Sequence, residues 1–134
     1  RFEKVENING TRFINDSKST NFHSVSLASE RVKNALLIMH GITKNIPTSE
    51  LQLSNEIKKI IIPNDMNLDR NLFHCEVEVI KSIFELEDIL NKDFQRFETV
   101  LFSCGGSSFN DFENYIERGK FFKSIVKNLK GGQN

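Results

Sequence analysis

Basic residues are in no excess in this sequence. Its 134 residues include 18 lysines and arginines and 18 aspartates and glutamates, so the formal net charge is zero. This balance argues against a dedicated nucleic-acid-binding protein, which usually carries a basic excess. No apolar stretch approaches the length of a membrane span, and no signal peptide is recognisable at the N-terminus. We therefore expect a cytoplasmic protein that binds neither nucleic acid nor membrane.

Cysteine is also scarce, and its spacing fits no metal site. Cys75 and Cys104 are the only two cysteines, and they stand far apart in the sequence. We expect two reduced thiols, because nothing in the pattern requires a disulfide. The three histidines have no metal-ligand spacing with acidic residues or cysteines, and only His40 falls in an expected site loop. The sequence therefore predicts no metal site.

The length of the chain suits a single domain spanning residues 1–134. A domain of this size buries roughly two thirds of the surface of its unfolded chain, so its core needs no disulfide. The sequence lacks an initiator methionine and begins directly in a strand-like pattern at Arg1. We therefore expect a piece of a longer protein.

Hydrophobic patterning predicts an α/β fold. Asn9-Gly10 separates two strand-like runs, and both residues tolerate the positive φ of a type I′ turn, so an antiparallel β-hairpin should open the domain. Strands and helices then alternate, which predicts a Rossmann-like, mainly parallel sheet with helices on both faces. Strands are expected at 35–39, 60–62, 75–79 and 99–102, and helices at 21–33, from 48 or 49 onward, at 82–93 and at 109–130. Ser19 or Thr20 should cap the first helix, and 64–71 is either a short helix or a loop.

The last expected helix has two distinct faces. Lysines share one face and apolar residues the other: Lys120, Lys123, Lys127 and Lys130 against Phe121, Phe122, Ile125, Val126 and Leu129. Such a helix either lies on a membrane surface or docks on the sheet, with its lysines near the negative end of the helix dipole. We favour docking on the sheet.

Three polar loops at the carboxyl ends of expected strands indicate a ligand site. They span 15–21, 40–44 and 103–108. Ligands of open α/β sheets bind beyond these strand ends, and the start of a following helix favours an anion. Asp16 and Lys18 add one charge of each sign, and Lys44 can hold a carboxylate. Gly105 and Gly106 let the backbone approach a ligand closely, although no P-loop sequence is present. Each loop is also compatible with a plain helix cap or turn.

Three ordered sequence blocks resemble the C-terminal domain of the Mur ligase family, in the branch that adds D-glutamate. The first block is NDSKSTN at 15–21, where the usual family form has alanine at position 19. The second is LIMHGITK at 37–44, and the third is LFSCGGSSFNDF at 101–112, continued by Asn114, Tyr115, Glu117, Arg118 and Gly119. The opening Arg1-Phe2-Glu3 also fits, so the resemblance covers essentially the whole chain.

This resemblance implies one domain of a three-domain, ATP-dependent ligase of peptidoglycan synthesis. ATP phosphorylates the carboxylate of UDP-MurNAc-L-alanine, and the amine of D-glutamate then attacks the acyl phosphate. ATP and magnesium would bind mainly to the central domain, which carries the P-loop that this chain lacks. The chain alone is therefore expected to be inactive, and the full enzyme to act as a monomer.

The resemblance also implies roles for individual residues. Arg1 would contact the ATP phosphates, Asp16 would contact the nucleotide ribose, and Lys18 would lie near the reacting centre. The residues implied for D-glutamate binding are Thr20, Lys44, Ser108, Phe109 and Tyr115, the last standing where the family usually has phenylalanine. Two other functions stay open: a domain of another Mur ligase or polyglutamate-adding synthetase, and a stand-alone anion-binding regulatory module.

Overall fold

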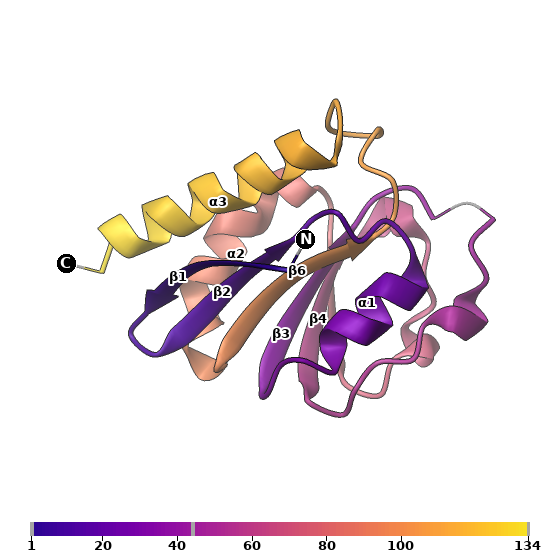
Figure 1. The fold of residues 1–134 in the computed structure, drawn as a ribbon, viewed down its shortest axis with the longest axis horizontal. Helices are drawn as coiled ribbons and strands as arrows, with labels where there is room; N and C mark the ends of the chain where they lie inside the picture. Colours follow the sequence, from indigo (N-terminus) through magenta and orange to yellow (C-terminus); the bar gives the residue numbers. More distant parts are fainter. Residues whose placement is uncertain (1, 44, 134) are drawn as a thin grey trace.

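The computed structural model describes residues 2–43 and 45–133 and contains one central sheet (Figure 1). Its strands are β1 (Glu3–Ile8), β2 (Thr11–Asp16), β3 (Ala35–His40), β4 (Ile57–Pro63), β5 (Glu76–Ile80) and β6 (Thr99–Gly105). They lie in the order β1-β2-β6-β3-β4-β5. β1 and β2 are antiparallel, and all other neighbours are parallel. The expected mainly parallel sheet with an opening hairpin is confirmed.

Helices cover both faces of this sheet, also as expected. α1 (Phe22–Ser29) packs on one face, and α2 (Leu86–Asp93) and α3 (Tyr115–Gly131) lie on the other (Figure 1). Every residue of β3 is buried, with Leu36 and Ile38 in the core under α2 and α3 and with Leu37 and Met39 in the core under α1. A strand buried on both faces explains the continuous apolar run in this part of the sequence.

The hairpin turn has the conformation that Asn9-Gly10 predicts. Both residues have positive φ, 52° at Asn9 and 94° at Gly10, as a type I′ turn requires. β2 then pairs with β6 up to Asp16, which lies opposite Ser103. The hairpin therefore places two of the expected site loops side by side.

Tertiary contacts replace the helix expected from residue 48 onward. Only a 3₁₀ turn, Thr48–Glu50, forms before β4 begins at Ile57. The hydroxyls of Ser26 and Ser29 on α1 accept hydrogen bonds from the N–H groups of Gln52 and Ser54, at 2.8 and 3.0 Å. These bonds tie the segment to α1 through backbone groups that a helix would have used internally.

The first helix is shorter than predicted and has a different cap. It ends at Ser29, and the side chain of Asn21 caps it by accepting a hydrogen bond from the N–H of Ser24 at 2.9 Å. Ser19 does not cap the helix because its hydroxyl donates to the carboxylate of Asp16. The predicted cap, Ser19 or Thr20, was therefore wrong, and the next polar residue in the sequence, Asn21, caps the helix.

The segment between β4 and α2 follows the prediction more closely. Residues 64–71, left open as helix or loop, contain one 3₁₀ turn, Asn64–Met66, and the start of a second, Arg70–Leu72. The predicted capping box is present: Ser82 accepts from the N–H of Phe84, and the carboxylate of Glu85 accepts from the N–H of Ser82. A 3₁₀ turn there leads into α2.

The last helix begins at Tyr115 rather than Phe109. The side chain of Asn114 caps it by accepting a hydrogen bond from the N–H of Glu117 at 2.9 Å. Residues 109–114 form turns instead, and Asp111 in this segment reaches the His40 ring. The prediction placed the start six residues early, because the contact that holds Asp111 in these turns comes from a strand distant in the sequence.

Docking of α3 on the sheet is confirmed. Its buried residues include Phe122, Ile125, Val126 and Leu129. Lys123 and Lys130 reach back to β1, with side-chain distances of 3.0 Å to Glu3 and 3.1 Å to Glu6. Among the described residues, no helix is long and apolar enough to cross a membrane.

Candidate functional site

The three polar loops meet at one edge of the sheet, beyond the ends of β2, β6 and β3. These strands are neighbours, so their carboxyl ends lie together. Ile42 and Ser107 exchange two backbone hydrogen bonds of 2.9 and 3.0 Å, and Gly105 donates to the carbonyl of Ser19 at 2.8 Å. The convergence expected from topology is therefore confirmed for the described part of these loops.

Glycines allow the loops to touch through their backbones. Gly41 has φ of +126°, and a Cβ added there would lie 2.4 Å from the carbonyl oxygen of Ser107. A Cβ added at Gly106 would lie 2.7 Å from the carbonyl carbon of Gly41. The sequence suggested that Gly106 clears space for a ligand. In the structure, the neighbour that occupies this space is the other loop.

Asp16 is a buried carboxylate at the centre of this edge. Its side chain accepts hydrogen bonds from the hydroxyls of Ser19 at 2.5 Å and Ser103 at 2.8 Å. Only 5% of its surface is exposed. The two serines, one from each adjacent strand end, fix the orientation of the carboxylate.

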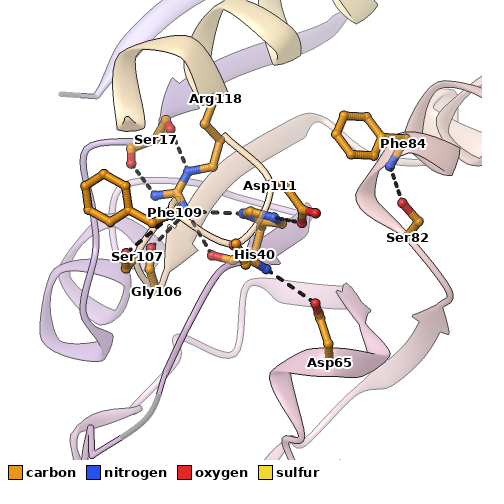
Figure 2. Close-up of polar contacts among 11 residues, drawn as sticks. Ser17, His40, Asp65, Ser82, Phe84, Gly106, Ser107, Phe109, Asp111 and Arg118 are labelled. Carbon is orange, nitrogen blue, oxygen red and sulfur yellow. Dashed lines mark hydrogen bonds and ion pairs between the residues drawn. The ribbon is translucent and has the colours of Figure 1, made fainter. Parts of the chain in front are cut away.

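Arg118 of α3 joins the three loops through its guanidinium (Figure 2). Its Nε donates to Ser17 Oγ at 2.9 Å, and its Nη2 donates to the Ser17 carbonyl at 2.8 Å. Its Nη1 faces the carbonyl of Gly106 at 2.8 Å, and both the carbonyl and Nδ1 of His40 at 3.2 Å. The side chain is completely buried. One charged group therefore contacts all three strand ends.

The contacts of His40 define its protonation. A guanidinium N–H can only donate, so Nδ1 of His40 must accept and carries no proton. Nε2 then carries the proton and donates to the Asp111 carboxylate at 2.8 Å. Burial lowers the pKa of His40 below its ordinary value of 6.5. The hydrogen bond to Asp111 opposes this shift, and the charge of Arg118 adds to it. His40 is therefore neutral at physiological pH, with the tautomer set by its two partners.

Known proteins with similar sequences are ligases. No family model matches the chain. The chain is 36% identical over 138 residues to the UDP-N-acetylmuramoylalanine–D-glutamate ligase of Thermosipho africanus, a match that covers 99% of this chain and 33% of that protein. It is 31% identical over 135 residues to the ligase of the same name from Hydrogenobaculum, covering 95% and 32%. This chain belongs to the Mur ligase family.

A solved Mur ligase structure has the same fold. It is a domain from Haemophilus ducreyi described as part of a UDP-N-acetylmuramate:L-alanyl-γ-D-glutamyl-meso-diaminopimelate ligase. The match has a TM-score of 0.61 at 12% identity and covers all of both chains. At this identity the likeness concerns the fold alone. The chain spans about a third of the length of the curated Mur ligases that it matches.

Four of the candidate Mur ligase residues lie in two groups at the sheet edge. Lys18 and Tyr115 both line a groove of about 390 Å³. The other residues that line it are Glu3, Asn15, Ser17, Ile116, Gly119, Lys120 and Lys123. Ser108 and Phe109 lie on the neighbouring loop, where Ser108 is nearly buried and the Phe109 side chain is 72% exposed. Thr20 is exposed and does not line this groove. Arg1 and Lys44 lie outside the described residues.

Sequence reasoning assigned no role to Arg118, Ser17, Asp111 or His40. A signal for Arg118 was present, because it stands four residues before Phe122 on the buried stripe of α3. A charged residue on such a stripe needs polar partners in the core. The partners of Arg118 could not be identified from the sequence, because they come from three separate segments of the chain.

The described part of this chain offers neither a metal site nor a reactive thiol. No group of three histidine, cysteine or acidic side chains there could hold a metal ion. Both cysteines are free, as predicted, and burial raises the pKa of Cys104 to about 12. A thiol this buried and this weakly acidic is a packing residue rather than a nucleophile.

Proposed function

We propose that this chain is the C-terminal, D-glutamate-binding domain of an ATP-dependent ligase that joins D-glutamate to UDP-MurNAc-L-alanine in peptidoglycan synthesis. The observation that carries the proposal is the match to ligases of this name through 99% of the chain. The share of those proteins that it covers, 33%, fits one domain of three.

The chemistry of this reaction is mainly a problem of positioning and charge. The γ-phosphoryl group of ATP passes to the carboxylate of UDP-MurNAc-L-alanine, and ADP leaves. The amine of D-glutamate attacks the acyl phosphate, the C–O bond to phosphate breaks, and an amide forms with loss of a proton. A domain that holds the amine in line lowers the barrier through orientation, and nearby cations stabilise the developing negative charge.

The groove at Lys18 and Tyr115 supports a role in this step. Lys18 is exposed and forms no ion pair with another described residue. Lys120 and Lys123 line the same groove and are partly neutralised, by Glu117 at 3.2 Å and by Glu3 at 3.0 Å. Lys18 is therefore our candidate for the cation near the reacting centre, with ATP contacts assigned to Arg1 and Asp16. ATP and magnesium would be held mainly by a domain outside this chain.

The amino-acid preference of the complete ligase tests the proposal. Phosphate release from ATP should depend on UDP-MurNAc-L-alanine and on D-glutamate, with L-glutamate and other amino acids as comparison substrates. Preference for another amino acid would instead indicate a sister Mur ligase or a polyglutamate-adding synthetase. A parent protein with no ATPase activity that binds anions through this domain would indicate a regulatory module.

Ser108→Ala should weaken D-glutamate binding selectively. The Ser108 hydroxyl makes no hydrogen bond within residues 2–43 and 45–133, and only 3% of Ser108 is exposed, so a carboxylate that enters this loop would meet a donor not yet used by the protein. A hydrogen bond to a charged group contributes about 1.5–3 kcal/mol, so KM for D-glutamate should rise about 10- to 100-fold. Steady-state kinetics of the complete ligase measures this, with KM for ATP as the internal control and Ser49→Ala, at an exposed serine, as the matched variant. An unchanged KM for D-glutamate would remove Ser108 from the site.

A further inference from the structure

The buried guanidinium of Arg118 has no carboxylate partner among the described residues. Its five contacts go to three backbone carbonyls, one hydroxyl and one imidazole nitrogen. Burying a charge is costly, and well-packed apolar residues often replace a buried ion without loss of stability. We therefore expect the role of Arg118 to lie in the positions that its rigid, planar set of donors imposes on the loops that it contacts.

We propose that Arg118 is a positioning residue for the D-glutamate site, and that His40 must be neutral for Arg118 to hold the three loops in place. This inference rests on the proposed function above. Neither residue is taken to touch the substrate.

Two of the three residues that Arg118 contacts lie close in the sequence to candidate ligand residues. Ser17, which accepts from Nε, precedes Lys18 in the sequence and donates its hydroxyl to the carbonyl of Tyr115 at 2.8 Å. Gly106, whose carbonyl accepts from Nη1, stands two residues before Ser108. Moving the guanidinium would therefore move the residues on both sides of the site together. Displacements of about 1 Å are enough to slow a reaction that depends on alignment.

Protonation of His40 would break this arrangement. A second proton at Nδ1 turns the acceptor of the Arg118 hydrogen bond into a donor, and sets two positive groups 3.2 Å apart. The charged groups that act on His40 are Arg118 from α3, Asp111 from the preceding turns and Asp65 from the 3₁₀ turn after β4. Cys104, buried near Arg118, stays a neutral thiol because its pKa is raised to about 12.

The direction of the pH effect follows from the lowered pKa of His40. The unfolded chain takes up the proton near the ordinary value of 6.5, and the folded chain takes it up only at lower pH. The contribution of neutral His40 is therefore fully present above about pH 6.5 and is lost as the pH falls through the folded-state pKa. Acidification should loosen the hold of Arg118 on the loops before the domain unfolds.

Steady-state kinetics of the complete ligase, from about pH 8.5 down to the lowest pH at which the enzyme stays folded, tests this inference. We expect KM for D-glutamate to rise at least several-fold toward the acidic end, while KM for ATP changes little. His40→Asn, whose amide oxygen can accept from Arg118 but does not titrate, should flatten this rise. His23→Asn, at an exposed histidine, should keep it. Arg118→Lys keeps the positive charge but removes the planar guanidinium with its several donors. This variant should raise KM for D-glutamate about tenfold at every pH.

Two results would overturn the inference: an acid rise that persists in His40→Asn, or an Arg118→Lys ligase that loses thermal stability but keeps its KM for D-glutamate. Nitrogen-15 NMR of the 134-residue chain supplies a test that does not depend on substrate. Nδ1 of His40 should be unprotonated, and the amide signals of Ser17 and Gly106 should titrate with it. If D-glutamate is not a substrate but this titration is seen, the proposed function fails and the network stands. If D-glutamate is the substrate and the amides do not follow His40, the positioning role fails.

Discussion

Gly41→Ala is expected to destabilise the folded chain by about 3–5 kcal/mol. The new Cβ would strain the backbone of residue 41 and would also collide with backbone atoms, which cannot move aside as a side chain can. Gly41 has φ of +126°, a region that L-residues rarely adopt, and the new Cβ would lie 2.4 Å from the carbonyl oxygen of Ser107. The two loops would have to separate, which breaks the paired backbone hydrogen bonds between Ile42 and Ser107. Urea unfolding followed by circular dichroism measures the loss.

Two alanine variants separate strain from collision. Gly10 has φ of +94°, and a Cβ added there would have no atom within 4 Å, so Gly10→Ala carries strain alone and should cost about 1–2 kcal/mol. Gly131 also has open space but no positive φ, and it lies in the last turn of α3, so Gly131→Ala should be neutral or slightly stabilising. Equal losses for Gly41→Ala and Gly10→Ala would show that the loops are not in backbone contact.

Phe102→Ala should be equally severe, with a loss of about 3–5 kcal/mol that comes from cavity formation in the core. The Phe102 ring on β6 stacks on Phe122 of α3, with centroids 4.6 Å apart and planes 5° from parallel. Both side chains are completely buried. Chemical unfolding measures the effect, and thermal unfolding should show a matching drop in Tm.

Phe109→Ala is the matched control for that variant, because the Phe109 side chain is 72% exposed. Its effect on stability should stay within about 0.5 kcal/mol. Phe109 is also a candidate D-glutamate residue, so the same variant should raise KM for D-glutamate in the complete ligase. Comparable instability in Phe102→Ala and Phe109→Ala would contradict the packing of α3 on the sheet.

The parts of the fold that depend on local sequence were predictable. Asn9-Gly10 indicated the hairpin because its turn needs two positive φ values, which the structure has. The apolar run from Ala35 indicated a strand buried on both faces. The segment after Thr48 was not predictable, because hydroxyls of Ser26 and Ser29 on another helix decide its path.

The site was predictable as a place rather than as a set of contacts. Alternation of strands and helices brought the three loops to one edge, since parallel strands end together. The sequence could not show that Arg118 reaches backbone carbonyls. Every residue has a carbonyl, so the residue type does not reveal which carbonyls accept from the guanidinium. The start of α3 was misplaced for a similar reason: Asp111 is held by the distant His40 ring at 2.8 Å.

Backbone atoms take part in many of the contacts that hold the site loops together. Ile42 and Ser107 pair through their main chains, and three of the Arg118 acceptors are main-chain carbonyls. Loop side chains that take no part in these contacts can therefore be exchanged during evolution without disturbing the frame that carries them. A lineage can drift toward a new amino-acid substrate by changing the residues that point at it, while the arginine and the paired glycines stay under constraint. The part of such a domain that changes least during evolution would then be the part that does not contact the ligand.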